Sequence, residues 1–219
     1  MRRFDLSVYL VTDRPLCLGR QLVDVVGEAV AGGVTLVQLR EKDAQTREFV
    51  ELARAVKALL DPFGVPLLIN DRVDVALACG AAGVHVGQKD MNPADVRAIV
   101  QGTLGPDAVV GLSVESEELA LAARDLPVDY LGAGPVFATT TKKDAAPVIG
   151  LAGLSRIVEL AGRPVVGIGA IGADNAAGVI RAGAAGVAVV SAVCSAPAPR
   201  EAAARLADVV RAARGVQGS

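Results

Sequence analysis

Ala81-Ala82-Gly83-Val84-His85-Val86-Gly87-Gln88-Lys89-Asp90 is the stretch that best defines the fold of this chain. In it, a glycine opens a short apolar run, which ends in a cluster of glycine and polar residues. The same opening recurs as Ala31-Gly32-Gly33-Val34 and as Ala184-Ala185-Gly186-Val187. Short apolar runs bounded in this way are typical of strands that are buried on both faces, as in parallel sheets. The repetition predicts a chain built from repeated βα units.

Eight apolar runs of this kind are predicted strands. They are Ser7–Val11, Thr35–Leu39, Pro66–Ile69, Gly83–Val86, Val109–Leu112, Tyr130–Leu131, Val165–Ile168 and Gly186–Val190. Stretches with an apolar period of about 3.6 residues lie between them and are predicted helices. These include Leu22–Ala31, Thr46–Leu60, Ala94–Val100 and Glu117–Arg124, the last on composition. Asn92-Pro93 is a typical helix start, with Asn as the N-cap and Pro in the first turn.

Strands that alternate with helices eight times predict an α/β fold, a (β/α)8 TIM barrel with parallel strands. An open doubly wound sheet is the alternative, because periodicity alone does not show whether the sheet closes. The 219 residues, 52% of them hydrophobic, suffice for one large core. Because no linker divides the chain, we expect a single domain over residues 1–219. Only Gln217-Gly218-Ser219 is expected to fray.

Composition argues against several classes of protein. A net charge of -2, with acids and bases mixed throughout, is atypical of nucleic-acid-binding surfaces. Glycine and charged residues interrupt every apolar stretch, so no membrane span or signal peptide is expected. Cys17, Cys79 and Cys194 lie far apart, which favours reduced thiols in a cytoplasmic protein. The oligomeric state stays open, a homo-oligomer included.

Acidic residues follow the third and fourth predicted strands. Asp71 comes directly after Asn70, and Asp90 lies just beyond the fourth strand. Neighbouring parallel strands are about 4.8 Å apart, so the two carboxylates can approach one cation. Mg²⁺ prefers one or two carboxylates together with waters and substrate phosphate oxygens, which predicts a magnesium site at Asp71 and Asp90. The alternative is that each Asp caps the following helix; it is weaker for Asp90, because Asn92 already starts that helix.

Basic residues follow the second predicted strand, in Val37-Gln38-Leu39-Arg40-Glu41-Lys42. Arg40 and Lys42 lie where they could clamp a diphosphate beside the predicted metal. The alternative is an ordinary ion-paired loop in which Arg40 and Glu41 neutralise each other. Gln38 shares a strand face with Arg40, toward the barrel interior, where its amide needs a partner. Four of the five lysines follow predicted strands in this way, a distribution that favours an anion site.

The longest irregular stretch runs from Gly134 to Asp144 and includes Thr139-Thr140-Thr141-Lys142-Lys143. Hydroxyl and ammonium groups in a long loop predict a lid over phosphate groups, with a plain surface loop as the alternative.

The seventh and eighth predicted strands end at Gly169 and Ser191. Loops in these places commonly form a phosphate site, and Gly169 permits a close backbone approach. The alternative is a tight turn, which glycine also serves. Two anion sites in one barrel indicate transfer between two substrates. Apart from Ser191, the first and last strands are expected to be mainly structural. His85, within the fourth strand, is expected to be a hydrogen-bonded barrel residue rather than a catalyst.

Together these motifs resemble the thiamine phosphate synthase family. The resemblance covers about Tyr9 to Ser191 and rests on Val37–Lys42, Ile69–Arg72, Gly83–Gln88, Gly132–Lys142 and Val189–Ala192, all in order. It implies condensation of 4-amino-2-methyl-5-(diphosphooxymethyl)pyrimidine with 4-methyl-5-(2-phosphooxyethyl)thiazole to give thiamine phosphate and pyrophosphate. It also implies Mg²⁺ as cofactor and a dissociative mechanism, in which pyrophosphate leaves before the thiazole nitrogen attacks.

The resemblance further implies a role for each matching residue. The pyrimidine diphosphate is held by Gln38, Leu39, Arg40, Glu41, Lys42, Asn70, Ser113 and Lys142; the thiazole phosphate by Thr139, Thr140, Thr141, Gly169, Val190 and Ser191; Mg²⁺ by Asp71 and Asp90; and Arg40, Ser113 and Lys142 are catalytic. Two positions depart from the family pattern: Ala170 replaces a frequent second glycine, and Lys89 a frequent acid. A related thiazole tautomerase and a non-catalytic phosphate sensor are the competing interpretations.

Overall fold

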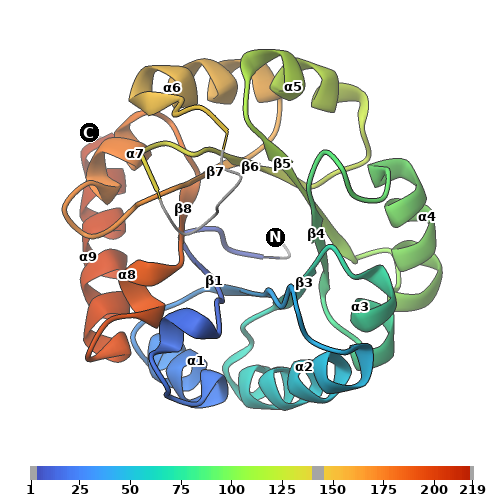
Figure 1. Ribbon diagram of the computed structural model, residues 1–219. Coiled ribbons are helices and arrows are strands. Elements are labelled where there is room, and N and C mark those ends of the chain that lie inside the picture. Colours follow the sequence, from blue (N-terminus) through green and yellow to red (C-terminus); the bar gives the residue numbers. More distant parts are fainter. Residues whose placement is uncertain (1–3, 140–145, 218–219) are drawn as a thin grey trace.

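The computed structural model describes residues 4–139 and 146–217. Within them, eight parallel strands close into a barrel in chain order, and β8 pairs back onto β1 (Figure 1). The strands are β1 (Val8–Val11), β2 (Leu36–Leu39), β3 (Leu67–Asn70), β4 (Gly83–Val86), β5 (Val109–Val114), β6 (Tyr130–Ala133), β7 (Val165–Ile168) and β8 (Gly186–Val189). The barrel is closed by the pairing of Tyr9 with Ala188. The predicted TIM barrel is therefore confirmed, and the open sheet is excluded.

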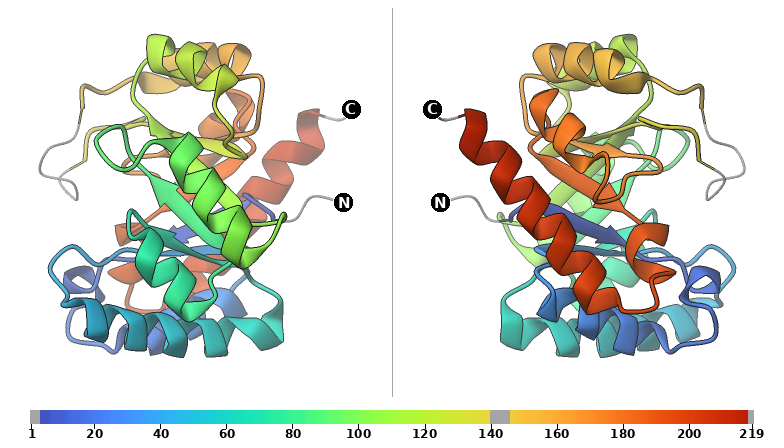
Figure 2. Two further views of the ribbon diagram at one scale, coloured as in Figure 1. Left: turned by 90° about the vertical axis from the view of Figure 1, so that its right-hand side faces the viewer. Right: turned by 90° about the vertical axis from the view of Figure 1, so that its left-hand side faces the viewer.

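The helices form a ring outside the barrel (Figure 1). They are α1 (Leu22–Ala31), α2 (Thr46–Leu60), α3 (Val73–Cys79), α4 (Pro93–Leu104), α5 (Glu117–Ala122), α6 (Gly150–Ala161), α7 (Ala176–Arg181), α8 (Ser191–Cys194) and α9 (Pro199–Gln217). The long helix α9 lies along the side of the barrel and packs against α1, α7 and α8 (Figure 2). Helix α9 thus covers the part of the barrel where β8 pairs with β1. Within the described residues, no helix is both long enough and apolar enough to cross a membrane.

Most predicted boundaries agree with the structure, and the differences have local causes. β5 and β6 each extend two residues beyond the prediction. The polar Ser113 and the side-chain-free Gly132 were expected to end these strands, but they stay paired with each other in the sheet. The Ala94 N–H donates to Asn92 Oδ1 at 2.9 Å, which confirms the predicted N-cap of α4. Helix α9 continues through Gln217, and Gly218 and Ser219 lie outside the described residues, so the expected fraying of the tail stays a prediction.

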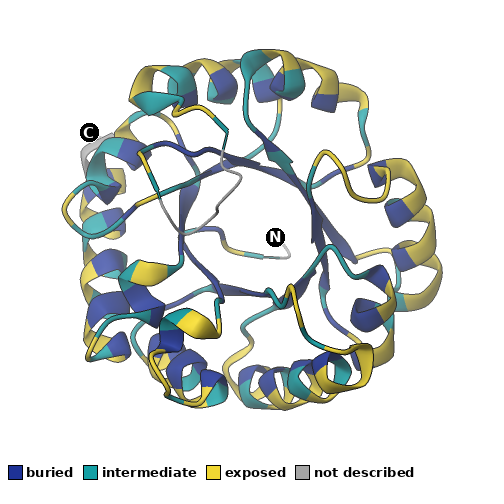
Figure 3. Cartoon of the chain, in the orientation of Figure 1, coloured by how far each residue is buried: buried dark blue, intermediate teal, exposed yellow. Residues whose placement is uncertain are grey.

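Strand side chains alternate between two cores. One set, which includes Tyr9, Leu36 and Tyr130, fills the barrel interior. The other set, which includes Leu10 and Leu39, packs between the barrel and the helices. The buried strands and the buried inner faces of the helices are visible in Figure 3. Because the strand period is two, this alternation decides which residues at the strand ends face the interior.

Candidate active site at the carboxyl-terminal rim

A pocket of about 220 Å³ opens at the carboxyl-terminal ends of the strands, and every strand or the loop after it contributes to its lining. Eleven of the predicted site residues line it: Gln38, Arg40, Lys42, Asn70, Asp71, Asp90, Ser113, Thr139, Gly169, Val190 and Ser191. The barrel thus gathers groups that are up to about 150 positions apart in the sequence. Their individual binding roles stay predictions.

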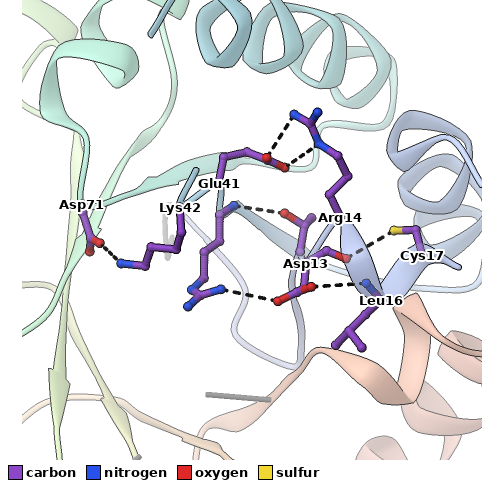
Figure 4. A network of polar contacts seen from close by, with 9 residues as sticks. Asp13, Arg14, Leu16, Cys17, Glu41, Lys42 and Asp71 are labelled. Atoms are coloured by element: carbon purple, nitrogen blue, oxygen red, sulfur yellow. Dashed lines mark hydrogen bonds and ion pairs between the residues drawn. The ribbon is translucent and has the colours of Figure 1, made fainter. Parts of the chain in front are cut away.

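Two other predicted residues lie away from the pocket lining. Leu39 is fully buried in the outer core, because it alternates with Gln38 along β2. Glu41 pairs with Arg14, whose Nη2 lies 3.0 Å from Glu41 Oε2 (Figure 4). Burial raises the pKa of the Glu41 carboxyl, and the hydrogen bond from Arg14 opposes this. A side-chain role at the substrate is therefore unsupported for both residues. The predicted residues Thr140, Thr141 and Lys142 lie outside the described residues.

Arg40 is positioned by the loop after β1. Its backbone N–H donates to Thr12 Oγ1 at 3.0 Å, and its Nη1 lies 3.5 Å from Asp13 Oδ2. The expected alternative, an Arg40–Glu41 pair, is not formed, because each of the two has another partner. Thr12 and Asp13, which directly follow β1, also line the pocket, and their side chains hold Arg40 there.

Asp71 and Asp90 form an acidic pair at one side of the pocket. Asp71 has a left-handed backbone (φ 58°), which Asp tolerates better than most residues. Its carboxylate accepts from Lys42 Nζ at 2.5 Å (Figure 4), while Arg72 takes the N-cap position of α3. The capping alternative is therefore wrong for Asp71.

The Asp90 carboxylate accepts from the Gly87 N–H at 2.8 Å. Burial and the neighbouring Asp71 carboxyl together raise the pKa of Asp90, as expected when two acids share one site. A divalent cation would relieve this repulsion, and two carboxylates suffice for Mg²⁺ when phosphate oxygens and water complete its shell. Among the described residues, no group of three or more His, Cys, Asp or Glu forms a fuller cage.

The opposite side of the pocket is formed by the loops after β7 and β8. Gly169 has φ +111°, and a Cβ there would lie 2.7 Å from Pro135, so glycine is required by conformation and by packing. The turn alternative therefore has independent support, although Gly169 also lines the pocket. Ala170 has φ +46°, which explains why a glycine would suit that position. Val190 and Ser191 line the pocket where α8 begins.

Beneath these groups, polar side chains are joined inside the barrel. His85 Nε2 lies 2.9 Å from Ser113 Oγ, and His85 Nδ1 lies 2.8 Å from the Tyr130 hydroxyl. The Tyr130 and Tyr9 hydroxyls are 2.7 Å apart, and Gln38 Nε2 donates to Tyr9 at 2.5 Å. Burial lowers the pKa of His85 to about 4, so the ring is neutral at neutral pH. The prediction of a hydrogen-bonded barrel histidine is confirmed.

Sequence reasoning missed Tyr9 and Tyr130, although both tyrosines lie in predicted strands. A buried tyrosine hydroxyl requires a partner, and this requirement was the available signal.

Comparisons with known proteins show which family this chain belongs to. A family model described as thiamine monophosphate synthase matches residues 8–193. The chain belongs to the thiamine monophosphate synthase family. The match spans the whole barrel, from β1 through most of α8, and membership makes the chain an enzyme of the transferase class.

Curated relatives in the family match nearly the full chain. The thiamine-phosphate synthase of Solidesulfovibrio magneticus is 63% identical over 202 residues, covering 92% of this chain and 93% of its own. That of Azorhizobium caulinodans is 54% identical and covers 96% and 98%. Among solved structures, a thiamine phosphate pyrophosphorylase from Pyrococcus furiosus superposes with a TM-score of 0.87 at 42% identity, covering 96% of this chain and 98% of that one. A 3-hexulose-6-phosphate synthase, at 18% identity and TM-score 0.69, shares the fold alone.

Proposed function

We propose that this chain is a thiamine phosphate synthase that joins 4-amino-2-methyl-5-(diphosphooxymethyl)pyrimidine to 4-methyl-5-(2-phosphooxyethyl)thiazole and releases pyrophosphate. The main support is the asymmetry of the pocket. On the β2 to β4 side, Arg40, Lys42, Asp71 and Asp90 combine cations with an acidic pair. On the β7 to β8 side, uncharged turns at Gly169 and Ser191 offer backbone groups instead. A diphosphate with its metal ion carries more charge and suits the first side. A monophosphate carries less charge and suits the second side.

The basic residues of the first side neutralise charge on the leaving group. Arg40 suits bidentate contact with phosphate oxygens, and Lys42 acts as a point charge. Asp71 and Asp90 would hold Mg²⁺, which supplies further positive charge to the diphosphate when bound. In the free protein, Arg40 lies against Asp13 and Lys42 against Asp71. The acids therefore keep both cations at the pocket before the anion arrives.

In the proposed dissociative reaction, the bond between the pyrimidine methylene carbon and the diphosphate oxygen breaks first, and its electron pair leaves with pyrophosphate. The thiazole nitrogen then donates its lone pair to the resulting carbocation. Catalysis thus depends on charge stabilisation and on placing the nucleophile, rather than on a protein base. Gln38 and Asn70 orient the pyrimidine, which agrees with a neutral, fully engaged His85.

A thiazole tautomerase would need a positioned acid–base residue and no metal–diphosphate site. A phosphate sensor would bind the thiazole phosphate without turnover. Incubation with both substrates and Mg²⁺, followed by chromatography for thiamine phosphate, separates the three proposals. The synthase proposal predicts product only when both substrates are present. Isomerised thiazole alone, or bound but unchanged thiazole phosphate, would instead support one of the two alternatives.

A further inference from the structure

A chain of hydrogen bonds joins two pocket residues that lie on strands that are not neighbours, Gln38 on β2 and Ser113 on β5. Its members, in order, are Gln38, Tyr9, Tyr130, His85 and Ser113. Tyr9 and Tyr130 are each at most 1% exposed, so water does not substitute for a missing partner there. Each bond in the chain therefore needs one donor and one acceptor from the protein itself.

With Gln38 Nε2 as the donor to Tyr9, counting hydrogens fixes the direction of the remaining bonds. Gln38 donates to Tyr9, and the Tyr9 hydrogen then goes to Tyr130. Tyr130 in turn gives its hydrogen to His85 Nδ1, which leaves the ring hydrogen on Nε2, directed at Ser113 Oγ. With the opposite ring tautomer, Tyr9 would accept from both neighbours, and its own hydroxyl hydrogen would be buried without an acceptor, an unfavourable state.

Two glycines leave the space that this chain occupies. A Cβ at Gly111 would lie 2.5 Å from His85 Nδ1 and would also collide with the Tyr130 ring. A Cβ at Gly132 would lie 3.2 Å from His85 Cε1. Both glycines sit in buried strands without a positive φ, so a turn does not account for them. Their absent side chains allow the contact between His85 and Tyr130.

We propose that Tyr9, Tyr130 and His85 are positioning residues: Tyr130 and His85 fix the polarity of Ser113 at one end of the chain, and Tyr9 fixes the orientation of Gln38 at the other. In this arrangement, Ser113 presents its hydroxyl hydrogen to the pocket, and Gln38 presents its carboxamide oxygen. A diphosphate oxygen only accepts hydrogen bonds, and an exocyclic amino group donates them, so both groups match the pyrimidine diphosphate. That ligand assignment rests on the proposed function, whereas the polarity follows from the hydrogen bonds alone.

The polarity is directly measurable because His85 is the one histidine in the sequence. In untagged protein labelled with ¹⁵N-histidine, a long-range ¹H–¹⁵N correlation spectrum reports which ring nitrogen is protonated. The expected result is a neutral ring with the hydrogen on Nε2. A hydrogen on Nδ1 would overturn the proposal, because Ser113 would then donate to His85 and turn its lone pairs toward the anion. This measurement needs neither substrate nor a variant.

Tyr130→Phe and Tyr9→Phe are a matched pair, since each removes one hydroxyl oxygen from the chain. Tyr130→Phe removes the donor to His85 Nδ1, so mixed tautomers are expected. Binding of inorganic pyrophosphate with Mg²⁺, measured by calorimetry, should weaken roughly twofold to tenfold, the range for one neutral hydrogen bond. In Tyr9→Phe, Tyr130 still donates to His85, so the tautomer and the affinity should match wild type.

An unchanged tautomer in Tyr130→Phe, or equal losses in both variants, would overturn the positioning role. If wild-type protein fails to bind pyrophosphate, the proposed function is contradicted, and the histidine spectrum still decides the polarity. In turnover, Tyr130→Phe should raise KM for the diphosphate substrate and leave KM for the thiazole phosphate unchanged. A purely structural defect would alter both.

Discussion

Replacing Gly111 by Ala tests the packing on which the buried hydrogen-bond chain depends. The added Cβ would lie 2.5 Å from His85 Nδ1 and against the Tyr130 ring, and both neighbours are buried side chains held by hydrogen bonds. Overpacking of this kind costs about 1 to 3 kcal/mol, and loss of the His85–Tyr130 bond adds about 1 kcal/mol. Alanine also reduces the conformational freedom of the unfolded chain relative to glycine, which offsets about 0.4 to 1 kcal/mol of this loss. The net expectation is a loss of about 1 to 3.6 kcal/mol of unfolding free energy.

Urea unfolding followed by circular dichroism measures this loss, and thermal unfolding should show a lower midpoint, by roughly 2 to 4 °C per kcal/mol. Gly102→Ala is the matched control, because Gly102 lies exposed in α4 and a Cβ there meets nothing within 4 Å. Alanine should stabilise that helix by about 0.8 to 1 kcal/mol. The two variants should therefore shift stability in opposite directions. A Gly111→Ala protein as stable as wild type, with an unchanged His85 tautomer, would show that a Cβ at this position does not overpack the His85–Tyr130 contact.

Three further predictions concern the acidic pair, the buried histidine and the ion pairs. Asp90→Ala should lower turnover by about a hundredfold or more and weaken its Mg²⁺ dependence, because a lost ligand removes several kcal/mol of charge stabilisation; a normal Mg²⁺ titration would contradict the metal role. Burial lowers the pKa of His85 from 6.5 to about 4. Between pH 4 and pH 6.5 the unfolded state therefore binds a proton that the folded state does not. The stability contributed by the neutral ring is lost as the pH falls through this range. The loss should reach about 3 kcal/mol relative to His85→Gln, and parallel pH profiles in urea would argue against it. Asp129→Asn should lower the unfolding free energy by about 1.5 to 3 kcal/mol, because the Asp129 carboxylate accepts from Arg97 at 2.6 Å and from the Val110 N–H at 2.7 Å. Asp208→Asn, at an exposed ion pair, should lower it by less than about 0.5 kcal/mol. Equal losses in unfolding assays would contradict this difference.

The strands and helices could be predicted well because local signals determine them. Apolar runs located all the strands, and Asn92-Pro93 located the start of α4. The strand ends at Ser113 and Gly132 were harder, since glycine and polar residues marked stops elsewhere and here remain paired in the sheet.

The side chains of the site were less predictable, because their partners are distant in sequence. Glu41 contacts Arg14 and Arg40 contacts Asp13, each 27 residues away. No local pattern distinguishes these pairs from an Arg40–Glu41 pair. Tyr9 and Tyr130 are 121 positions apart and meet only because the barrel closes. Continuous apolar strands hide the period of two. In β2 the polar Gln38 marked the inner face, whereas in the apolar strands the inner face became clear only from the register.

We propose that one pocket holds a diphosphate and a monophosphate substrate together and joins their carriers. The most direct measurement is the stoichiometry of products when the protein is incubated with the pyrimidine diphosphate, the thiazole phosphate and Mg²⁺. We expect thiamine phosphate and pyrophosphate in equal amounts, and neither product when Mg²⁺ is chelated. Pyrophosphate released without thiamine phosphate, or the absence of both products with Mg²⁺ present, would contradict it.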